Sequence, residues 1–454
     1  MMNCVKMNAW ELFAKQRRFD LIYKILFLRN RESPYFRSLY LEHIRAFNNF
    51  YERCPVKTKP DDFIDAFLDI DKSVAARGYD DNSVIYTDKD MQIMGSAHRL
   101  TVACFRNLDV PVSVQDVSFW APDYGHFMGL DINRGAADHN ALEYVCLNKN
   151  AHILQLHSVA SRLFEEEVHS IMSRHGFIYY AKNVHLSENG YVNLTLLNYD
   201  DDGERGKWVG TPTNGFQGAR EKARRCMGEN PLRVFVFVCG IEEQAIQAKN
   251  EIRALFGLDN DSCHSNDTHL QAVSVAQALF NDNSLRILDQ RNCTSDTSKL
   301  DKRITLLKKT LMKKNMDMNR VVCVGSSPLN AAGLRVAADL DCLSLDKIPK
   351  LLKIYGVSDH EEVMHLYPYD KRDIIENPSL YFWYKGAKFA SLEVMLAMKE
   401  NRKEIPKDII DCELITHFID SVCTSASVPV PNILPNSSFL TRAKDVFRAI
   451  STKL

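Results

Sequence analysis

The sequence contains no pair of cysteines in C-x-x-C spacing, although it has 12 cysteines in all. Many of them stand singly inside apolar runs such as VFVFVCG and RVVCVGS, where a thiol behaves as a small core hydrophobe. Closely spaced cysteine pairs mark structural zinc sites, and regular cysteine frameworks mark disulfide-rich secreted domains. The cysteine pattern therefore predicts neither class.

Long apolar runs are also absent from the sequence. No stretch approaches the about 18 apolar residues of a membrane-spanning helix. The N-terminal stretch MMNCVKMNAWELFAKQRRFD becomes charged before any apolar run reaches signal-peptide length. We therefore expect a cytoplasmic protein with no membrane insertion.

The chain has no excess of either charge, with 57 Lys and Arg against 58 Asp and Glu. A protein that holds nucleic acid by counterion release normally presents a positive field. The balance disfavours nucleic acid as a partner and leaves small molecules as the expected ligands.

The composition, 45% hydrophobic and 25% charged, is that of an ordinary globular protein. A length of 454 residues suggests about three domains, and the alternation of helical and strand patterns predicts an α/β (α+β) multidomain protein. The expected parts are a helical segment at 1–60, a small α/β unit at 61–160, a middle α/β unit at 161–295, a C-terminal α/β domain at 296–423, and a linker with a short helix at 424–454.

Several segments carry clear secondary-structure patterns. Helices are expected at DDFIDAFLDIDKSVAARG, after GSAHR, at ASRLFEEEVHSIMSRHG and at EEQAIQAKNEIRALFG. Strands are expected at SVIYTD, MQIMG, VPVSVQ, FIYYAKNVHL, YVNLTLLNY and RVFVFVCG.

The segment RVVCVGSSPLNAAGLRVAADLDCLSLD predicts a strand, a Gly-Ser turn, a helix and a second strand bearing Asp-x-Asp. Alternation along the second strand places Asp339 and Asp341 on one face. Two neighbouring carboxylates repel each other unless a cation lies between them, and such pairs carry Mg²⁺ in phosphoryl transfer. Gly325 and Ser326 would offer backbone N–H groups and a hydroxyl to a phosphate.

This arrangement resembles the DNA polymerase β-like nucleotidyltransferases, which carry Gly-Ser followed by Asp-x-Asp. Downstream, KFASLEVMLAMKENRKEIPKDIIDCELI is similar to the corresponding segment of abortive-infection-type members. The resemblance implies a nucleoside triphosphate as substrate or ligand, with Mg²⁺ or Mn²⁺ held by Asp339 and Asp341. It also implies a nucleotide cleft lined or shaped by Lys388, Lys399, Lys407 and Asp408.

Members of that family take a third carboxylate from a later strand. The stretch SDHEEVMHLYP offers Asp359 and Glu361, and we assign the third catalytic position to Asp359. Without such a group the domain would bind a nucleotide and do no chemistry.

A second glycine turn, Gly95-Ser96-Ala97-His98-Arg99, opens a predicted helix. Backbone amides at a helix start and an arginine fork suit a phosphate group. The segment resembles the ParB and sulfiredoxin-like fold, which implies nucleotide binding by Gly95, Ser96, His98 and Arg99. Ala97 stands where sulfiredoxins carry their cysteine, so sulfinic-acid repair is excluded. A nucleotide-dependent switch and a small-molecule kinase remain, the kinase with Asp69, Asp71 or Asp116 as its base.

The middle unit contains two weaker patterns. Cys263, His264, Asp267 and His269 could bind a transition metal, or Asp267-Thr268 could simply cap the following helix. Basic residues in GFQGAREKARRCMGENPLR suit either a solvated helix face or a sugar-phosphate site, namely Arg220, Lys222, Arg224 and Arg225.

The order of segments resembles multidomain proteins from surface-polysaccharide gene clusters. That resemblance implies a small acceptor such as a sugar phosphate or polyol. The sequence thus predicts a Mg²⁺-dependent nucleotidyl- or phosphotransferase with a possible second, kinase-like site. Two alternatives stay open: a non-catalytic nucleotide sensor, and a toxin-like nucleotidyltransferase modifying RNA or protein.

Overall fold

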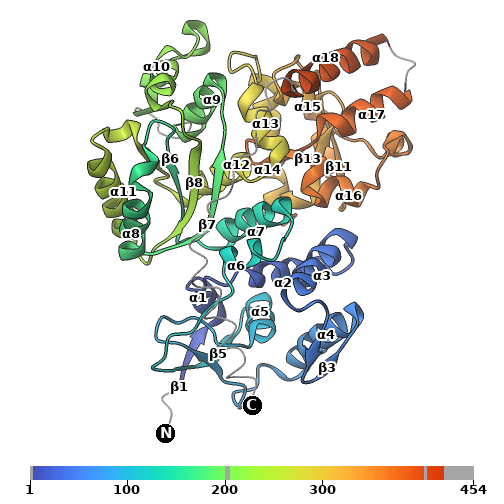
Figure 1. Ribbon diagram of the computed structural model, residues 1–454. Coiled ribbons are helices and arrows are strands. Elements are labelled where there is room, and N and C mark those ends of the chain that lie inside the picture. The colour runs from blue at the N-terminus through green and yellow to red at the C-terminus, as the bar shows by residue number, and fades with distance from the viewer. Residues whose placement is uncertain (1–3, 200–204, 403–405, 424–454) are drawn as a thin grey trace. The chain divides into compact units, whose positions relative to one another are not determined.

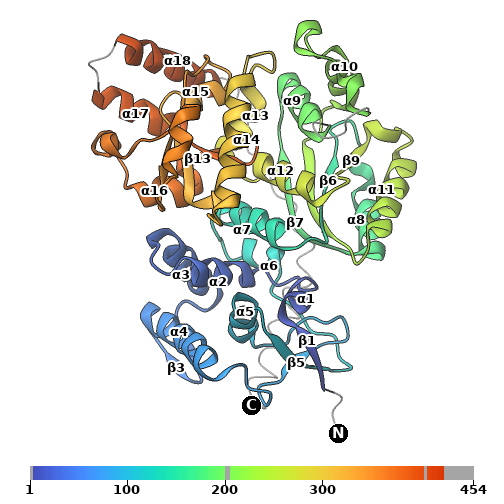
Figure 2. The same ribbon diagram turned by 180° about the vertical axis from the view of Figure 1, so that it is seen from behind.

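The computed structural model describes residues 4–199, 205–402 and 406–423, which form two compact units (Figure 1; Figure 2). The first unit covers residues up to 134 and the second covers residues 135–423. Helices accompany sheets of three, five, two and four strands, which confirms a mixed α/β, multidomain architecture. The predicted linker and helix at 424–454 lie outside the described residues.

The first unit combines helices with a small mixed sheet. Its helices are α1 (Ala9–Phe13), α2 (Asp20–Arg29), α3 (Pro34–Asn48), α4 (Pro60–Arg77), α5 (Ala97–Phe105) and α6 (Tyr124–Met128). Its strands are β1 (Cys4–Asn8), β2 (Glu52–Arg53), β3 (Val56–Lys57), β4 (Ile85–Thr87) and β5 (Asp109–Val114). The sheet has the order β1-β5-β4, and β2 pairs with β3.

The core of the first unit is aromatic. Helices α2 to α5 contribute a buried cluster of Phe27, Leu28, Tyr40, Ile44, Phe63, Ile64, Phe67 and Val102. The predicted helices of this unit are confirmed. The strand expected at MQIMG is wrong, because only a single bridge between Thr87 and Ile93 forms there.

The second unit begins with a four-stranded antiparallel sheet of order β7-β8-β6-β9. The strands are β6 (Ala151–Leu156), β7 (Phe177–Val184), β8 (Leu232–Val238) and β9 (Cys263–Ser265). The helices are α7 (Arg134–Leu147), α8 (Glu165–His175), α9 (Glu188–Asn198), α10 (Gln217–Cys226), α11 (Glu242–Phe256), α12 (His269–Leu279) and α13 (Asp282–Gln290).

Both faces of this sheet are buried. On one face, α8 and α11 bury an apolar cluster that includes Leu154, Leu156, Phe235, Phe237 and Cys263 (Figure 1). The opposite face carries the buried apolar residues Ile153, Val234 and Val236, and beside them the polar residues Gln155 and His264 of β6 and β9.

One predicted strand of this unit is wrong. The segment YVNLTLLNY forms most of helix α9, whose first turn is capped by the Ser187 hydroxyl accepting from the Gly190 N–H at 3.1 Å. The alternation of apolar and polar residues imitated a strand, but Asn193 instead donates to the Leu288 carbonyl oxygen of the neighbouring helix at 2.8 Å. The N-cap and these tertiary contacts outweigh a local preference.

The C-terminal part of the second unit is built on a five-stranded sheet of order β12-β11-β10-β14-β13. Strand β10 is antiparallel to β11 and parallel to β14, and β11 is parallel to β12. The strands are β10 (Val321–Val324), β11 (Leu340–Ser344), β12 (Val357–Asp359), β13 (Tyr381–Tyr384) and β14 (Ala387–Ala390). The helices are α14 (Ser298–Lys313), α15 (Ser327–Ala331), α16 (Lys371–Glu376), α17 (Leu392–Arg402) and α18 (Pro406–Cys423).

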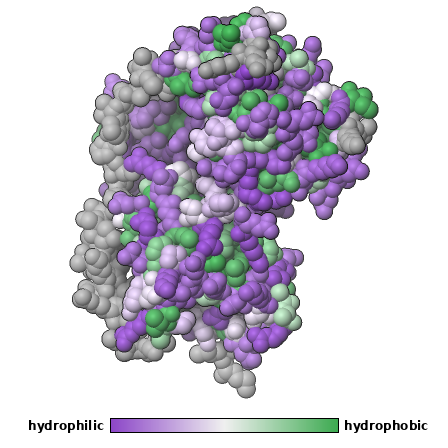
Figure 3. Space-filling model, turned by 90° about the vertical axis from the view of Figure 1, so that its right-hand side faces the viewer, coloured by the Kyte–Doolittle hydropathy of each residue, from purple (hydrophilic) through white to green (hydrophobic). Residues whose placement is uncertain are grey.

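Hydrophobic residues on the face drawn in Figure 3 form small separate groups among hydrophilic ones. Among the described helices, none combines the length and the apolar character needed to cross a bilayer.

Candidate functional site

The turn after β10 brings Gly325 against Asp341. Gly325 has φ +68°, a left-handed conformation that favours glycine, and a β-carbon there would lie 2.4 Å from Asp341 Oδ2. Ser326 follows, and the Ser327 hydroxyl donates to the Val324 carbonyl oxygen at 2.8 Å, which closes the turn. Helix α15 has only five residues, so the backbone N–H groups of the turn would contribute more to binding an anion than a helix dipole would.

The two predicted metal ligands lie at the start of β11. Asp341 pairs with Val324 of β10, whereas Asp339 precedes the strand and is exposed. Leu340 between them is fully buried, as predicted from alternation. The Ser358 hydroxyl donates to Asp341 Oδ1 at 2.7 Å, which fixes the orientation of this carboxylate.

Asp359 does not join this pair. In the parallel pairing of β11 and β12, Asp341 stands beside Ser358 and Cys342 stands beside Asp359. Side chains alternate along a strand, so Asp359 faces away from Asp341. Its Oδ1 instead accepts from the Glu361 N–H at 3.0 Å. Within the described residues, no three His, Cys, Asp or Glu side chains gather in a group suited to a metal ion.

Two residues that the sequence did not single out complete the site. His360 Nε2 lies 4.0 Å from Asp341 Oδ2, and its Nδ1 lies 3.1 Å from the Tyr367 hydroxyl. The Tyr367 hydroxyl therefore contacts the imidazole on the side away from Asp341.

The surroundings of His360 favour the neutral form of its imidazole. Burial lowers its pKa, while the carboxylates of Asp341 and Asp339 act in the opposite direction. Burial also raises the pKa of Tyr367. His360 lies two positions after Ser358, so the spacing alone predicts that the two side chains share a face. Only the strand register shows that this face is the one that carries Asp341.

Lys388 lies in the core and not in a cleft. Its Nζ donates to the carbonyl oxygens of Asn319 at 2.9 Å and Ile375 at 2.8 Å. The ammonium also lies 4.5 Å from the ring centre of Tyr381 and 5.5 Å from that of Trp383. Burial lowers the pKa of Lys388 to about 8. We therefore assign it a role in packing β14 against its neighbours.

Lys399 is also buried and is fully engaged in ion pairs. Its Nζ lies 3.2 Å from Asp408 and 2.7 Å from Asp411, which joins α17 to α18. Arg402 binds Asp408 at 2.6 Å, and Arg335 binds Asp411. Arg335 lies in the segment that leads to Asp339, so this network of ion pairs holds that segment against α18.

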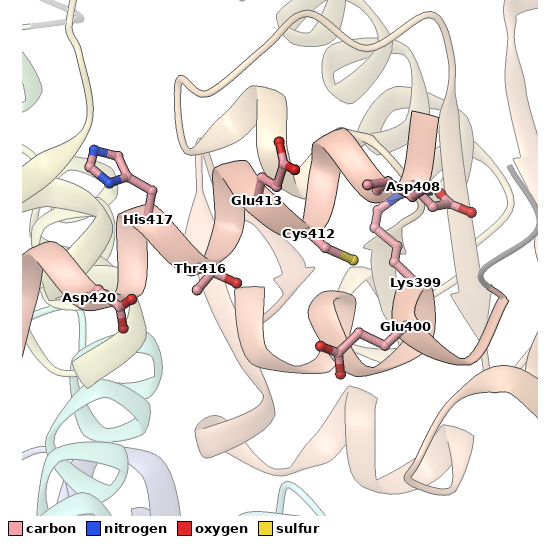
Figure 4. A pocket seen from close by; sticks show the side chains of 9 residues that line it. Lys399, Glu400, Asp408, Cys412, Glu413, Thr416, His417 and Asp420 are labelled. Carbon is pink, nitrogen blue, oxygen red and sulfur yellow. Dashed lines mark hydrogen bonds and ion pairs between the residues drawn. The ribbon is translucent and has the colours of Figure 1, made fainter. Parts of the chain in front are cut away.

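A groove of about 550 Å³ runs between α17 and α18 (Figure 4). Lys399 and Asp408 line it, but the other charged groups are the exposed carboxylates of Glu400, Glu413 and Asp420. A triphosphate would be repelled by that lining. Lys407 is exposed near the start of α18 and is not among the lining residues.

A second cavity, of about 500 Å³, lies beside Tyr367. Its lining consists of Met364, His365, Tyr367, Pro368, Tyr369, Asp370, Lys371 and Asp373. Because Tyr367 also contacts His360, this cavity borders the candidate site.

In the first unit, the structure separates the residues of the Arg99 motif. Ser96 is left-handed at φ 60°, and the Arg99 guanidinium donates to the Ser96 hydroxyl at 2.5 Å. His98 points into the aromatic core, where its Nε2 lies 3.1 Å from the Tyr40 hydroxyl and its ring centre lies 4.5 Å from that of Phe67. Burial lowers the pKa of His98 well below its usual range.

The space above Gly95 is open, since a β-carbon there would meet no atom within 4 Å. The turn thus presents Gly95, Ser96 and Arg99 together, and His98 supports it from within. Of the three carboxylates considered as a base, Asp71 is buried in ion pairs with Arg31 and Arg106, and Asp69 and Asp116 are exposed.

The metal pattern of the middle unit does not assemble. Cys263 belongs to the apolar cluster, and His269 Nε2 lies 2.7 Å from the Val145 carbonyl oxygen. Thr268 accepts from the Gln271 N–H and caps α12, close to the cap expected at Asp267-Thr268.

The basic residues of α10 are mostly paired. Lys222 and Arg225 both bind Asp261, and Arg224 binds Glu188. Only the Arg220 side chain of this predicted set makes no ion pair among the described residues, and its Nε donates to the Gly215 carbonyl oxygen at 2.8 Å.

Comparison of the chain with protein-family models, with curated proteins and with solved structures finds no match. The two family resemblances therefore remain predictions, and functional reasoning starts from the site itself.

Proposed function

We propose that this protein is a Mg²⁺-dependent nucleotidyl- or phosphotransferase that acts on a small acceptor. The observation that carries the proposal is the contact between the Gly325 turn and the Asp341 carboxylate. It brings backbone groups suited to phosphate next to a carboxylate pair suited to a cation.

The residues present fit one divalent cation. Asp341 uses Oδ1 on Ser358 and keeps Oδ2 on the side of the turn, and Asp339 is exposed beside it. Mg²⁺ is commonly bound by one or two protein carboxylates, with water and substrate phosphates completing an octahedron, and Mn²⁺ accepts the same ligands. Such an ion supplies charge stabilisation to a transferred phosphoryl group.

The chain's own residues would orient the reactants. The Ser326 hydroxyl and the turn amides would hold phosphate oxygens, and the Tyr367 cavity would hold the acceptor. The resemblances favour a sugar phosphate or polyol as that acceptor, in surface-polysaccharide biosynthesis. The turn at Gly95, Ser96 and Arg99 supports a second phosphate-binding, kinase-like site in the same way.

One observation favours a second candidate function, a nucleotide sensor without turnover. Asp359 faces away from Asp341, and Ser358 and His360 take the positions on the shared face. A two-metal mechanism would lack its third carboxylate in that arrangement. Turnover, and not binding, distinguishes the two candidates.

Thermal-shift measurements with the four nucleoside triphosphates and Mg²⁺ test the proposal, because a ligand at about 100 times its Kd stabilises a protein by about 2.7 kcal/mol. We expect a shift that is lost in Asp341→Asn and Asp339→Asn and retained in the matched control Asp359→Asn. A separate shift should be lost in Arg99→Ala. Equal shifts in wild type and in the Asp339→Asn/Asp341→Asn double variant would refute the site.

Release of pyrophosphate or nucleoside diphosphate in the presence of mixed sugar phosphates and polyols then separates transferase from sensor. Product formation that depends on Asp341 identifies the enzyme. Binding without product in every mixture identifies the sensor.

A further inference from the structure

Two histidines on the sheet face opposite the apolar cluster have rings that make no hydrogen bond to any described residue. His157 follows β6, and its N–H donates to the Ser262 carbonyl oxygen at 2.9 Å, which continues the pairing of β6 with β9. Gln155 pairs with His264 across the two strands. Alternation therefore places Gln155, His157 and His264 on the same face, opposite the apolar cluster.

The polar side chains next to these histidines have hydrogen-bond partners, whereas the two rings have none among the described residues. Gln155 and Asn198 exchange two hydrogen bonds of 2.9 and 3.0 Å. Ser158 hydrogen-bonds to the Tyr191 hydroxyl through both its N–H, at 3.1 Å, and its side chain. His157 is only 4% exposed, and its buried Nδ1 has no partner among the described residues. Buried polar atoms in proteins are almost always paired, so the Nδ1 of His157 is available to a bound ligand.

Charged groups of both signs lie near the two rings. Burial lowers the pKa of both histidines to about 3. Lys222 and Arg253 act in the same direction on both rings, whereas Asp261 raises the pKa of His157. Lys222 is 6% exposed and donates to the Asn260 carbonyl oxygen and to Asp261, each at 2.6 Å. These two bonds use two of the three N–H donors of its ammonium group.

An aromatic pair continues this face outward. The ring centre of Tyr199 lies 5.4 Å from that of His264 and 5.0 Å from that of Trp208. Trp208 is 43% exposed. A ligand whose charged end reached the histidines could therefore lay a flat or sugar-like remainder on these rings.

We propose that the polar cluster of His157, His264 and Lys222 is a binding site for a small phosphate monoester, with the two imidazoles donating hydrogen bonds to the phosphate oxygens. The neutral rings each carry one N–H donor, and the surrounding cations favour a dianion. A phosphate monoester offers both rings and Lys222 three terminal oxygens and nearly two negative charges, whereas a carboxylate offers two oxygens and one charge. The site is independent of the proposed transferase centre at Asp341.

The test uses the full-length protein labelled with [2-¹³C]histidine, titrated with inorganic phosphate, glucose 1-phosphate and acetate. Two histidine signals, assigned through His157→Gln and His264→Gln, should move and saturate with inorganic phosphate or glucose 1-phosphate and stay fixed with acetate. Stronger binding of glucose 1-phosphate would identify a phosphate monoester as the ligand, and binding of inorganic phosphate alone would overturn the monoester assignment.

Lys222→Met should raise the dissociation constant at least tenfold. If that variant does not fold, Lys249→Met tests the contribution of a nearby cation in its place. The matched controls are His185→Gln, an exposed histidine of the same unit, and Arg224→Gln, an outward residue of α10. Asp341→Asn should leave the titration unchanged. Unmoved signals for His157 and His264 with every probe, or equal shifts with acetate, would overturn the proposal.

Discussion

The carboxylate of Asp341 lies so close to Gly325 that a β-carbon at residue 325 would stand 2.4 Å from Asp341 Oδ2. Two independent constraints therefore select glycine at this position, the left-handed backbone and the neighbouring carboxylate. Any substitution of Gly325 would therefore displace the carboxylate of Asp341, which defines the candidate site.

We expect Gly325→Ala to abolish the Mg²⁺-nucleotide thermal shift and to destabilise the second unit by more than the about 1–2 kcal/mol of left-handed strain alone. Gly257→Ala is the matched control, because Gly257 has φ +63° and open space around it. It should lose stability through strain and keep the nucleotide response. An unchanged response in Gly325→Ala would show that the contact with Asp341 has no functional role.

Lys399→Met should destabilise the pairing of α17 with α18 by about 3 kcal/mol or more, because it leaves the buried carboxylates of Asp408 and Asp411 short of a cation. Lys407→Met, a change at an exposed lysine of α18, should stay within about 0.5 kcal/mol of wild type. Calorimetric unfolding of both variants measures the difference. Equal stabilities would contradict the structural role assigned to Lys399.

Lys388 predicts a pH-dependent difference in stability. Its pKa is about 8 in the folded chain against 10.5 for an ordinary lysine, so between those values the folded chain has lost a proton that the unfolded chain keeps. The stability of wild type relative to Lys388→Met should therefore rise between about pH 8 and pH 10.5, by about 3 kcal/mol in total. Below pH 8 the difference should be constant.

Unfolding temperatures of the two proteins, measured in parallel from pH 7 to pH 10, check this expectation. Other groups titrate in the same range, but they are common to both proteins and cancel in the difference. A flat difference across the series would mean that Lys388 is solvated in solution.

Asp71 and Asp69 on helix α4 should behave differently although both were considered as a kinase base. Asp71→Asn removes a buried carboxylate that binds Arg31 and Arg106, and should destabilise the first unit by about 2 kcal/mol. Asp69→Asn, at an exposed pair with Lys72, should change stability by less than about 0.5 kcal/mol. Thermal unfolding of the two variants decides whether Asp71 is a structural residue.

The sequence predicted most strands and helices whose patterns are locally strong. Apolar runs rich in β-branched residues identified β8 and β10, and periodicity identified α4 and α11. Helix α9 was missed because its alternating residues imitate a strand. The cap at Ser187 is a local signal that the strand interpretation overlooked, whereas the contact with Leu288 comes from a distant part of the chain.

The face of a strand on which a side chain lies was harder to predict than the strand itself. Asp359 was assigned to the site because the family resemblance implies a third carboxylate from a later strand, but a shift of one residue in strand register reverses the face of every side chain. The roles of His98, Lys388 and Lys399 could not be predicted either. The sequence around a polar residue in a motif does not show whether its side chain is buried in the core or lies in a binding site.

The two acidic residues at β11 are unequal partners. Asp341 is fixed by Ser358 and by the strand, whereas Asp339 precedes the strand and is exposed. A cation that enters would find one carboxylate already oriented and would have to immobilise the other. The entropy lost on binding would then fall mainly on Asp339, so affinity could be tuned there by changing the mobility of a single side chain while the sheet stays as it is.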